Sequence, residues 1–344
     1  MKIALIGWSG NNNLGDERMY YCIKKYFHKH KIIRFKSFLQ AILEIRRVNS
    51  CDFVLIGGGG LIFRGFSRYV DFLNKITKPF GCIGISIEAD GLNDDMKEGL
   101  EVLKNKAEFI YVRDRKSSLM LGDHFKVIVG PDITFMYPYQ KSAEVTTDSC
   151  TLNLRDWFWW DLELHSLWHE RLGRWYEKRP WIKYFYPLPK WNPDKLASLV
   201  KEKFDKVYPL VLYSGSFGKT DQDELKKYFS RVPTKSNLDA LKASRYLVGM
   251  RLHSLIFATQ MGIPFLSLSY EPKNVNYCTD IGYEQLSIDL RKLATFDDKL
   301  EYMKAHYVQI RGDLLAYTAD SSKKVMYIFK TIEKLMTAQS RDHK

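Results

Sequence analysis

Arg251 and His253 stand two residues apart, where the sequence predicts that a helix begins. An apolar strand is predicted over 246–248, helical spacing follows from Leu252, and a second strand is predicted over 265–268. In such a unit ligands bind at the carboxyl end of the strand, where the helix N-terminus favours an anion. A guanidinium can hold a carboxylate or phosphate by two parallel hydrogen bonds, and an imidazole can carry a proton near neutral pH. These side chains therefore indicate an anion site with a group for proton transfer.

A third candidate, Arg155, follows the predicted strand 151–154. An arginine after the first strand of a domain lies at the edge where open α/β sheets bind ligands. Each candidate also has a purely structural explanation. Arg155 could form a salt bridge with Asp156 or another neighbour, Arg251 could pair with an acid in the core, and His253 could cap a turn.

Five short motifs follow one another over residues 3–275, and their ordered set resembles the polysaccharide pyruvyl transferases. The motifs are Gly10 to Glu17, Gly57 to Phe63, Val112 to Ser117 with Gly130 to Asp132, Arg251 to His253, and Tyr270 to Lys273. Glu271 stands where an aspartate is usual in the family. Residues 157–191 lie outside the resemblance.

The resemblance implies an enzyme that moves the enolpyruvyl unit of phosphoenolpyruvate onto a sugar diol and closes it as a pyruvate ketal, in surface polysaccharide biosynthesis. It implies no cofactor and no metal ion. The donor would be held by Arg155, Arg251, Leu252, His253 and Lys273. Of these, Arg251 and His253 are the catalytic candidates, with His253 as the group for the acid and base steps.

The first half of the chain is assigned to the acceptor saccharide. The loop 10–16 follows the first predicted strand, and its asparagines can bond sugar hydroxyls or brace the turn themselves. The glycines 57–60 follow the predicted strand 52–56, where they allow a tight turn or a close approach of backbone to ligand. The residues expected to bind the acceptor are Asn13, Asp16, Gly58, Gly59, Gly60, Trp159 and Trp160.

Seven of the eight tryptophans lie within residues 157–191. They could form a platform on which the acceptor sugar stacks, to which Trp159 and Trp160 are assigned. They could also form a peripheral foot on the inner membrane face, because tryptophan favours the interface. An aromatic core of an inserted helical segment is the third interpretation.

Two other patterns resemble known sites but do not fit them. The segment 214–220 lies between a predicted strand over 210–213 and a helix, yet Tyr213 stands where a phosphate-binding loop needs its first glycine. A plain connection with Asp221 as helix N-cap is favoured. His165 and His169 could share a helix face, but no zinc signature surrounds them.

The composition bounds the class of protein. The chain of 344 residues is 45% hydrophobic, has a mean hydropathy of -0.31 and carries a net charge of +13. No apolar run approaches the roughly 20 residues that span a bilayer, and residues 1–7 are expected to form a strand and not a signal peptide.

The net positive charge fits a solvated basic surface or attraction to acidic small molecules or phospholipid. No nucleic-acid recognition motif is present. The five cysteines are expected to be reduced core thiols of a cytoplasmic protein.

Alternating strands and helices predict an α/β fold of two Rossmann-like domains that face a cleft. The family resemblance implies the same arrangement, similar to that of GT-B glycosyltransferases. The first domain is expected over 1–140, on the acceptor side, and polar residues 138–149 link it to the second. The second is expected over 150–320, on the donor side, with the aromatic-rich insert 157–191. A helical tail is expected over 321–344.

Two other functions stay open from the sequence. One is a GT-B-type glycosyltransferase, with Arg251 and the helix N-terminus on the diphosphate of a nucleotide sugar. The other is a non-catalytic protein that binds glycan through its tryptophans. Phosphate release from phosphoenolpyruvate would distinguish a pyruvyl transferase from both of these alternatives. The partners expected are phosphoenolpyruvate and a glycan or lipid-linked saccharide, with peripheral membrane contact left open.

Overall fold

Six parallel strands form the sheet of the N-terminal domain, in the order β2-β1-β3-β4-β5-β6. The computed structural model describes residues 1–62, 65–88, 91–140, 144–155, 175, 179, 181–182, 192–216, 219–290 and 293–342. The strands are β1 (Lys2–Ile6), β2 (Lys31–Phe35), β3 (Phe53–Ile62), β4 (Phe80–Ile87), β5 (Ile110–Val112) and β6 (Val127–Val129). Every residue of β4 is buried, as expected for a parallel strand covered by helices on both faces. The strand order reverses between β1 and β3, which is where such sheets bind ligands.

The helices of this domain alternate with its strands, as the sequence predicts. They are α1 (Leu14–Tyr26), α2 (Phe38–Leu43), α3 (Ile45–Val48), η1 (Phe66–Tyr69), α4 (Val70–Lys75), α5 (Asp94–Lys106), α6 (Arg115–Leu121) and η2 (Ile133–Met136). Helix α1 buries Met19, Cys22 and Ile23. It begins at Leu14, so Gly15 and Asp16 lie in its first turn.

The glycines 57–60 do not form a turn, and that interpretation was wrong. They lie inside β3 and pair with β4, Gly57 with Ile83 and Gly59 with Ile85. Gly58 and Gly59 have positive φ angles of 84° and 108°. A Cβ on Gly57 would lie 2.1 Å from the carbonyl oxygen of Ile83. Glycine is therefore required here by backbone conformation and by close packing between strands.

Five parallel strands form the second sheet, in the order β11-β10-β9-β7-β8. They are β7 (Ser149–Asn153), β8 (Lys206–Pro209), β9 (Tyr246–Gly249), β10 (Phe265–Ser269) and β11 (Ser287–Asp289). The strand expected over 210–213 is misplaced, because β8 precedes it and residues 210–212 continue as a buried extended segment. This order reverses between β7 and β9, so both domains have the same strand order relative to their own first strand.

The helices of the second domain are α9 (Pro193–Lys203), α10 (Asp221–Leu225), α11 (Asp239–Lys242), α12 (Leu252–Gln260), α13 (Pro272–Asp280), η3 (Glu284–Leu286), η4 (Leu293–Thr295) and α14 (Phe296–Ala305). The unit β9–α12–β10 is the one that the sequence predicts around Arg251. No helix among the described residues is long and apolar enough to cross a membrane.

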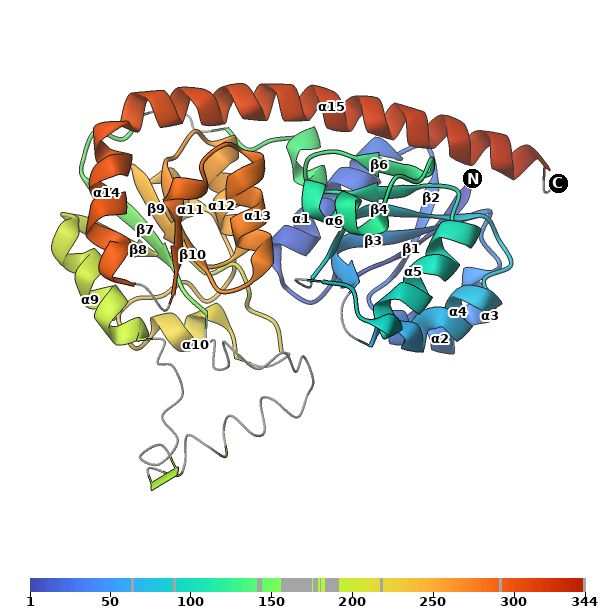
Figure 1. Ribbon diagram of the computed structural model, residues 1–344, viewed down its shortest axis with the longest axis horizontal. Coiled ribbons are helices and arrows are strands. Elements are labelled where there is room, and N and C mark those ends of the chain that lie inside the picture. Colours follow the sequence, from blue (N-terminus) through green and yellow to red (C-terminus); the bar gives the residue numbers. More distant parts are fainter. Residues whose placement is uncertain are drawn as a thin grey trace.

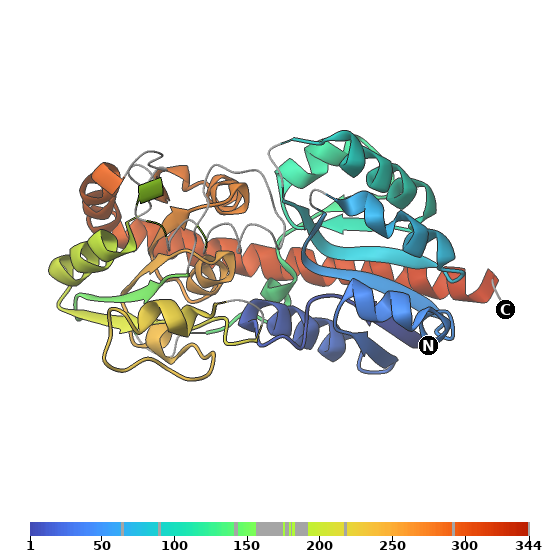
Figure 2. The same cartoon turned by 90° about the horizontal axis from the view of Figure 1, so that it is seen from below.

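A single helix of 36 residues, α15 (Tyr307–Asp342), ends the described chain. The tail expected over 321–344 is only its last part, because the helix begins at Tyr307. It runs along one side of both domains (Figure 1), and Figure 2 shows the same from below. Phe329 packs against the rings of Tyr26 and Phe27 at 5.1 and 5.9 Å, and Tyr26 donates a hydrogen bond to Glu333 at 3.0 Å. Helix α15 therefore joins the C-terminal end of the chain to the N-terminal domain.

The two domains also contact each other directly. The backbone of Asn13 forms an isolated antiparallel bridge with Tyr213, and the Leu14 N–H donates to the carbonyl of Leu212 at 2.8 Å. The Gln260 side chain donates to Thr134 at 3.0 Å. The loop before α1 is thus attached to the second domain close to the ends of β7 and β9.

Candidate active site

Arg155 and Arg251 follow the two strands between which the order of the second sheet reverses. Arg155 comes two residues after β7, and Arg251 comes two residues after β9. Neighbouring parallel strands end at one edge of the sheet, so both arginines lie at the expected ligand edge. The structure confirms this placement, which the sequence predicts from the strand pattern.

The guanidinium of Arg155 lies against Tyr270, the residue after β10. It donates a hydrogen bond from Nη1 to the Tyr270 hydroxyl at 3.0 Å, and its centre is 5.1 Å from the ring centroid. Lys273 Nζ lies 5.8 Å from the centroid of the same ring. Tyr270 therefore connects two of the predicted donor residues. The suggested partner Asp156 lies outside the described residues.

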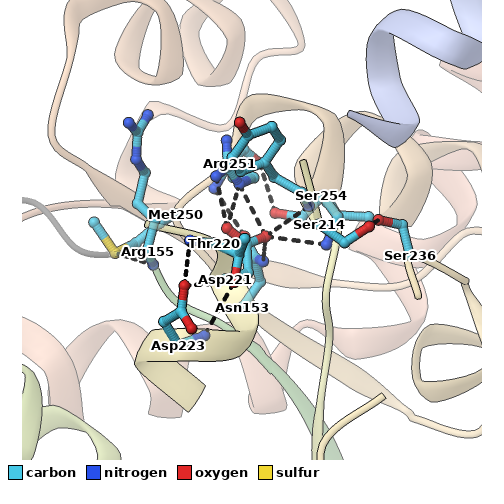
Figure 3. A network of polar contacts seen from close by, with 12 residues as sticks. Asn153, Arg155, Ser214, Thr220, Asp221, Asp223, Ser236, Met250, Arg251 and Ser254 are labelled. Atoms are coloured by element: carbon cyan, nitrogen blue, oxygen red, sulfur yellow. Dashed lines mark hydrogen bonds and ion pairs between the residues drawn. The ribbon is translucent and has the colours of Figure 1, made fainter. Parts of the chain in front are cut away.

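Arg251 is paired with a buried acid, which is the structural explanation that the sequence left open. Its Nε lies 2.7 and 2.9 Å from the two carboxylate oxygens of Asp221, and Nη2 lies 2.6 Å from Oδ1 (Figure 3). Asp221 is fully buried, whereas 13% of the Arg251 side chain is exposed. The pair occupies Nε and Nη2, and Nη1 has no hydrogen bond to any described residue. Arg251 can therefore keep Asp221 and still hold an anion.

Asp221 is not the N-cap of α10, and that prediction was wrong. Thr220 caps the helix, through a reciprocal pair of hydrogen bonds with Asp223. Asp221 instead points inward, where it accepts hydrogen bonds from the backbone of Leu212 and Tyr213 at 3.0 and 3.1 Å. The N-cap pattern at 220–223 is shifted by one residue from the one assumed. An N-cap assigned to Thr220 leaves Asp221 without a capping role, and this would have marked Asp221 as an acid that faces inward.

His253 lies in the first turn of α12, as predicted, and 12% of its side chain is exposed. Its Nε2 lies 3.7 Å from Oδ2 of Asp132, which is ion-pair distance but too long for a hydrogen bond. Nε2 is buried and has no hydrogen-bond partner. The ring caps no turn among the described residues. Asp132 is held by Thr134, whose N–H and hydroxyl lie at 2.9 and 2.8 Å, and by Arg113 at 3.1 Å.

Burial lowers the pKa of His253 from 6.5 to about 4. The Asp132 carboxylate opposes this shift, while Arg113, Lys273 and Arg251 add to it. The imidazole is therefore neutral at pH 7. In this state His253 is prepared to accept a proton and not to donate one, which limits the role predicted for it as an acid.

Lys273, in the first turn of α13, forms ion pairs with Glu271 and with Glu88 of the N-terminal domain, the latter at 3.0 Å. Burial alone would lower the pKa of Lys273, but the two carboxylates outweigh it and hold that pKa above its ordinary value. Lys273 is thus a fixed positive charge at the domain junction. Glu88 follows β4 and lies next to Gly60, where a Cβ would come 1.9 Å from its Oε1.

Asp16, a predicted acceptor residue, lies in the first turn of α1 and is buried. Its side chain is 9% exposed, and its carboxyl group has no hydrogen bond or ion pair with any described residue. A Cβ on Gly59 would lie 3.2 Å from its Oδ1. Burial raises the pKa of Asp16 from 3.8 to about 7, although Arg113, Lys273 and Arg251 oppose the shift.

The structure brings together most, but not all, of the predicted site. Asn13 contributes its backbone to the bridge with Tyr213, and its side chain does not cap α1. Gly58 packs on Met19, with a Cβ position 3.6 Å from that side chain. Trp159 and Trp160 lie outside the described residues. A small pocket at the junction contains the predicted Leu252 and Lys273 among its walls, which are Arg113, Asp114, Asp132, Leu252, Ile256, Lys273, Tyr277, Asp280 and Tyr317.

Two parallel-sheet domains whose ligand edges meet at a shared junction define a GT-B-like α/β protein. The model of the polysaccharide pyruvyl transferase family matches residues 13–272, which is most of the chain. The chain therefore belongs to this family, which indicates a transferase that acts in polysaccharide biosynthesis.

Solved structures agree on the fold. The structure of S. aureus MnaA with UDP is similar over 98% of this chain and 97% of its own, with a TM-score of 0.56 and 10% identity. A UDP-GlcNAc 2-epimerase from Neisseria meningitidis bound to UDP-GlcNAc covers 97% and 100%, with a TM-score of 0.50 and 13% identity. At such identities the likeness shows the fold alone. A search of curated proteins found no match.

Proposed function

We propose that this protein transfers pyruvate from phosphoenolpyruvate to two hydroxyls of one sugar and forms a pyruvate ketal. The family supports a transferase of this kind. The single observation that carries the proposal is the set of cations at the end of the second sheet. Arg155, Arg251 and Lys273 come from the ends of three adjacent strands, β7, β9 and β10.

The charges of the donor match these cations. Phosphoenolpyruvate carries a carboxylate and a phosphate on the same carbon, and both groups suit guanidinium and ammonium donors. Arg155 and Arg251 would hold these two anions, and Lys273 would add a third charge. The N-terminus of α12 points its free N–H groups at the same edge. Asp221, Glu88 and Glu271 offset the charges of Arg251 and Lys273. Recognition of a dianion would therefore rest on the donors that stay open to it, among them Nη1 of Arg251 and the N–H groups of α12.

The reaction needs both proton transfer and protection of a cationic carbon. Protonation of the methylene carbon makes the neighbouring carbon electrophilic, a sugar hydroxyl attacks it, phosphate leaves, and a second hydroxyl closes the ring. His253 stands beside the proposed anion site, and its neutral ring can take a hydroxyl proton. The scheme uses the side chains of the chain itself and calls for no cofactor.

We assign the acceptor to the side of the N-terminal domain. Asp16, Gly59 and Gly60 face the junction from that domain, next to His253 and Lys273. The acceptor would be a glycan or a lipid-linked saccharide. We place the reaction in the cytoplasm, where phosphoenolpyruvate is available, with peripheral contact to the inner membrane face if the acceptor is lipid-linked.

The proposal is tested by following phosphate release from phosphoenolpyruvate with a panel of oligosaccharides and lipid-linked saccharides. We expect release that depends on one class of acceptor, and a product whose methyl carbon and ketal carbon are visible by NMR. Release of a nucleoside diphosphate from a nucleotide sugar, with none of phosphate from phosphoenolpyruvate, would show a glycosyltransferase instead.

A further inference from the structure

Asp16 has a buried carboxyl group without a partner, at a place where a ligand would meet it. It is 9% exposed, and no described residue forms a hydrogen bond or ion pair with its side chain. Gly59 next to it has no side chain, and a Cβ there would lie 3.2 Å from Oδ1. Burial of an unpaired polar group costs free energy, so such groups normally have partners. The Asp16 oxygens are not among the fully enclosed unpaired atoms of the described residues, so they keep a path to solvent by which a substrate can reach them.

His253 of the second domain meets the same turn of α1. A Cβ on Gly15 would lie 2.0 Å from His253 Nδ1, so the imidazole rests on the backbone next to Asp16. The opposite nitrogen, Nε2, faces the Asp132 carboxylate at 3.7 Å. The contact is longer than a hydrogen bond, but the negative charge of Asp132 favours a proton on Nε2 over one on Nδ1. The lone pair is then on Nδ1, which lies against the backbone of Gly15, the residue before Asp16.

We propose that Asp16 is the acid that protonates the methylene carbon of phosphoenolpyruvate, and that His253 is the base that accepts the proton of the attacking hydroxyl. This inference rests on the proposed function and assigns its proton transfers to two residues from different domains. It narrows the role expected for His253 from the sequence, where that residue was the candidate for both the acid and the base steps.

The charges around the two residues support this division. The groups that face both of them are Arg113, Asp132, Arg251 and Lys273. Burial raises the pKa of Asp16 to about 7 and lowers the pKa of His253 to about 4. Between these values Asp16 keeps its proton and His253 lacks one. A pair of groups whose environments push their pKa values apart in this way has the protonation states of an acid and a base.

The proton balance of the reaction fits this pair. In the first step the Asp16 proton forms the new C–H bond of the methyl group, the hydroxyl oxygen bonds to the neighbouring carbon, and its proton passes to His253 Nδ1. In the second step the bond from that carbon to the phosphate oxygen breaks, and the electron pair leaves with phosphate. The second hydroxyl then bonds to the carbon and its proton returns to Asp16. The His253 proton departs with the phosphate, so both residues are restored.

The test compares wild type with Asp16→Asn, a variant of nearly the same shape that cannot donate an acidic proton. The matched control is Asp94→Asn, the same change in the first turn of α5, where the side chain is 98% exposed. Rates are measured from pH 5 to 9 with phosphoenolpyruvate and the acceptor found to release phosphate. We expect Asp16→Asn to lower kcat by ~10²–10⁴-fold. The kcat/KM of wild type should fall at high pH, and that of the variant should not. The KM for phosphoenolpyruvate and the rate of Asp94→Asn should stay close to wild type.

Two outcomes overturn the assignment. The assignment is wrong if Asp16→Asn retains more than a tenth of the wild-type rate and its kcat/KM falls at high pH as that of wild type does. If that variant does not fold, Asp16→Glu replaces it, and an unmoved high-pH limb in this variant would exclude Asp16 as the acid. Wild type without any turnover of phosphoenolpyruvate would overturn the proposed function itself, which separates the two failures.

Discussion

The carboxylate of Asp221 holds Arg251 by both Nε and Nη2, at 2.6 to 2.9 Å. Asp221 also accepts the backbone N–H groups of Leu212 and Tyr213. Those two residues contact the loop before α1, through the Leu212 carbonyl and the bridge from Tyr213 to Asn13. One buried acid therefore fixes the proposed donor arginine and the segment that joins the two domains.

Asp221→Asn should weaken both stability and donor binding. The change leaves the Arg251 charge without its buried partner, and breaking a buried pair in this way costs about 3–5 kcal/mol. Urea unfolding measures the loss, and calorimetry with phosphoenolpyruvate measures the affinity. Glu101→Gln is the control, because its pair with Lys104 is exposed and is expected to contribute less than ~1 kcal/mol. Equal unfolding curves for the two variants would contradict the importance of the Asp221 pair.

Gly15→Ala tests the contact between α1 and the imidazole. The added Cβ would lie 2.0 Å from His253 Nδ1, so one of the two must move. We expect a lower melting temperature and a large loss of activity. In a His253→Ala background the same change should cost much less stability, because the side chain that it meets is gone. A double-mutant cycle measures this coupling, and additive effects would show that the two residues do not touch.

The pKa of Asp16 predicts a pH dependence of stability. Between pH 3.8 and about 7 the unfolded chain has released the Asp16 proton while the folded chain still holds it. The folded state therefore loses stability as pH rises through this window, by at most about 4 kcal/mol. Asp16→Asn removes this loss, so its advantage in unfolding free energy over wild type should grow from pH 4 to 7 and then level off. A difference that is independent of pH would contradict the raised pKa.

His253→Ala should lower kcat by ~10²–10⁴-fold while donor affinity falls much less than in Arg155→Ala. The arginine holds charge that is present in the bound donor, whereas the histidine acts as the proton moves. His253→Gln keeps a hydrogen-bonding side chain but cannot accept the proton, so it should not restore the rate. Steady-state kinetics with near-normal turnover in the Gln variant would remove His253 from the proton transfers.

Much of the fold could be predicted because most helices and strands follow from local patterns of apolar and polar residues. The apolar run of β9, the helical spacing from Leu252 and the strand after Pro264 place Arg251 and His253 correctly. The β3 glycines were misread because a glycine run has no side-chain pattern that distinguishes strand from turn. Strand β8, with the sequence Lys-Val-Tyr-Pro, was missed because the apolar segment directly after it gives the stronger signal.

The electrostatics of the site could not be predicted from the sequence. The neutral state of His253 and the raised pKa of Asp16 both follow from burial between two domains. No pattern of residue types reports that burial. Likewise Glu88 became visible only when the fold brought it to Lys273, 185 residues away in the chain.

The most direct measurement is a calorimetric titration of wild type and Arg155→Ala with phosphoenolpyruvate and with a panel of nucleotide sugars. Arg155 donates a hydrogen bond to the hydroxyl of Tyr270, and a thermal unfolding curve of Arg155→Ala establishes that the variant is folded before its affinity is compared. We predict that wild type binds phosphoenolpyruvate and not the nucleotide sugars. Arg155→Ala should weaken this binding by ~2–4 kcal/mol, the cost of removing a charged hydrogen-bond donor. Binding of a nucleotide sugar together with no heat from phosphoenolpyruvate would contradict the account.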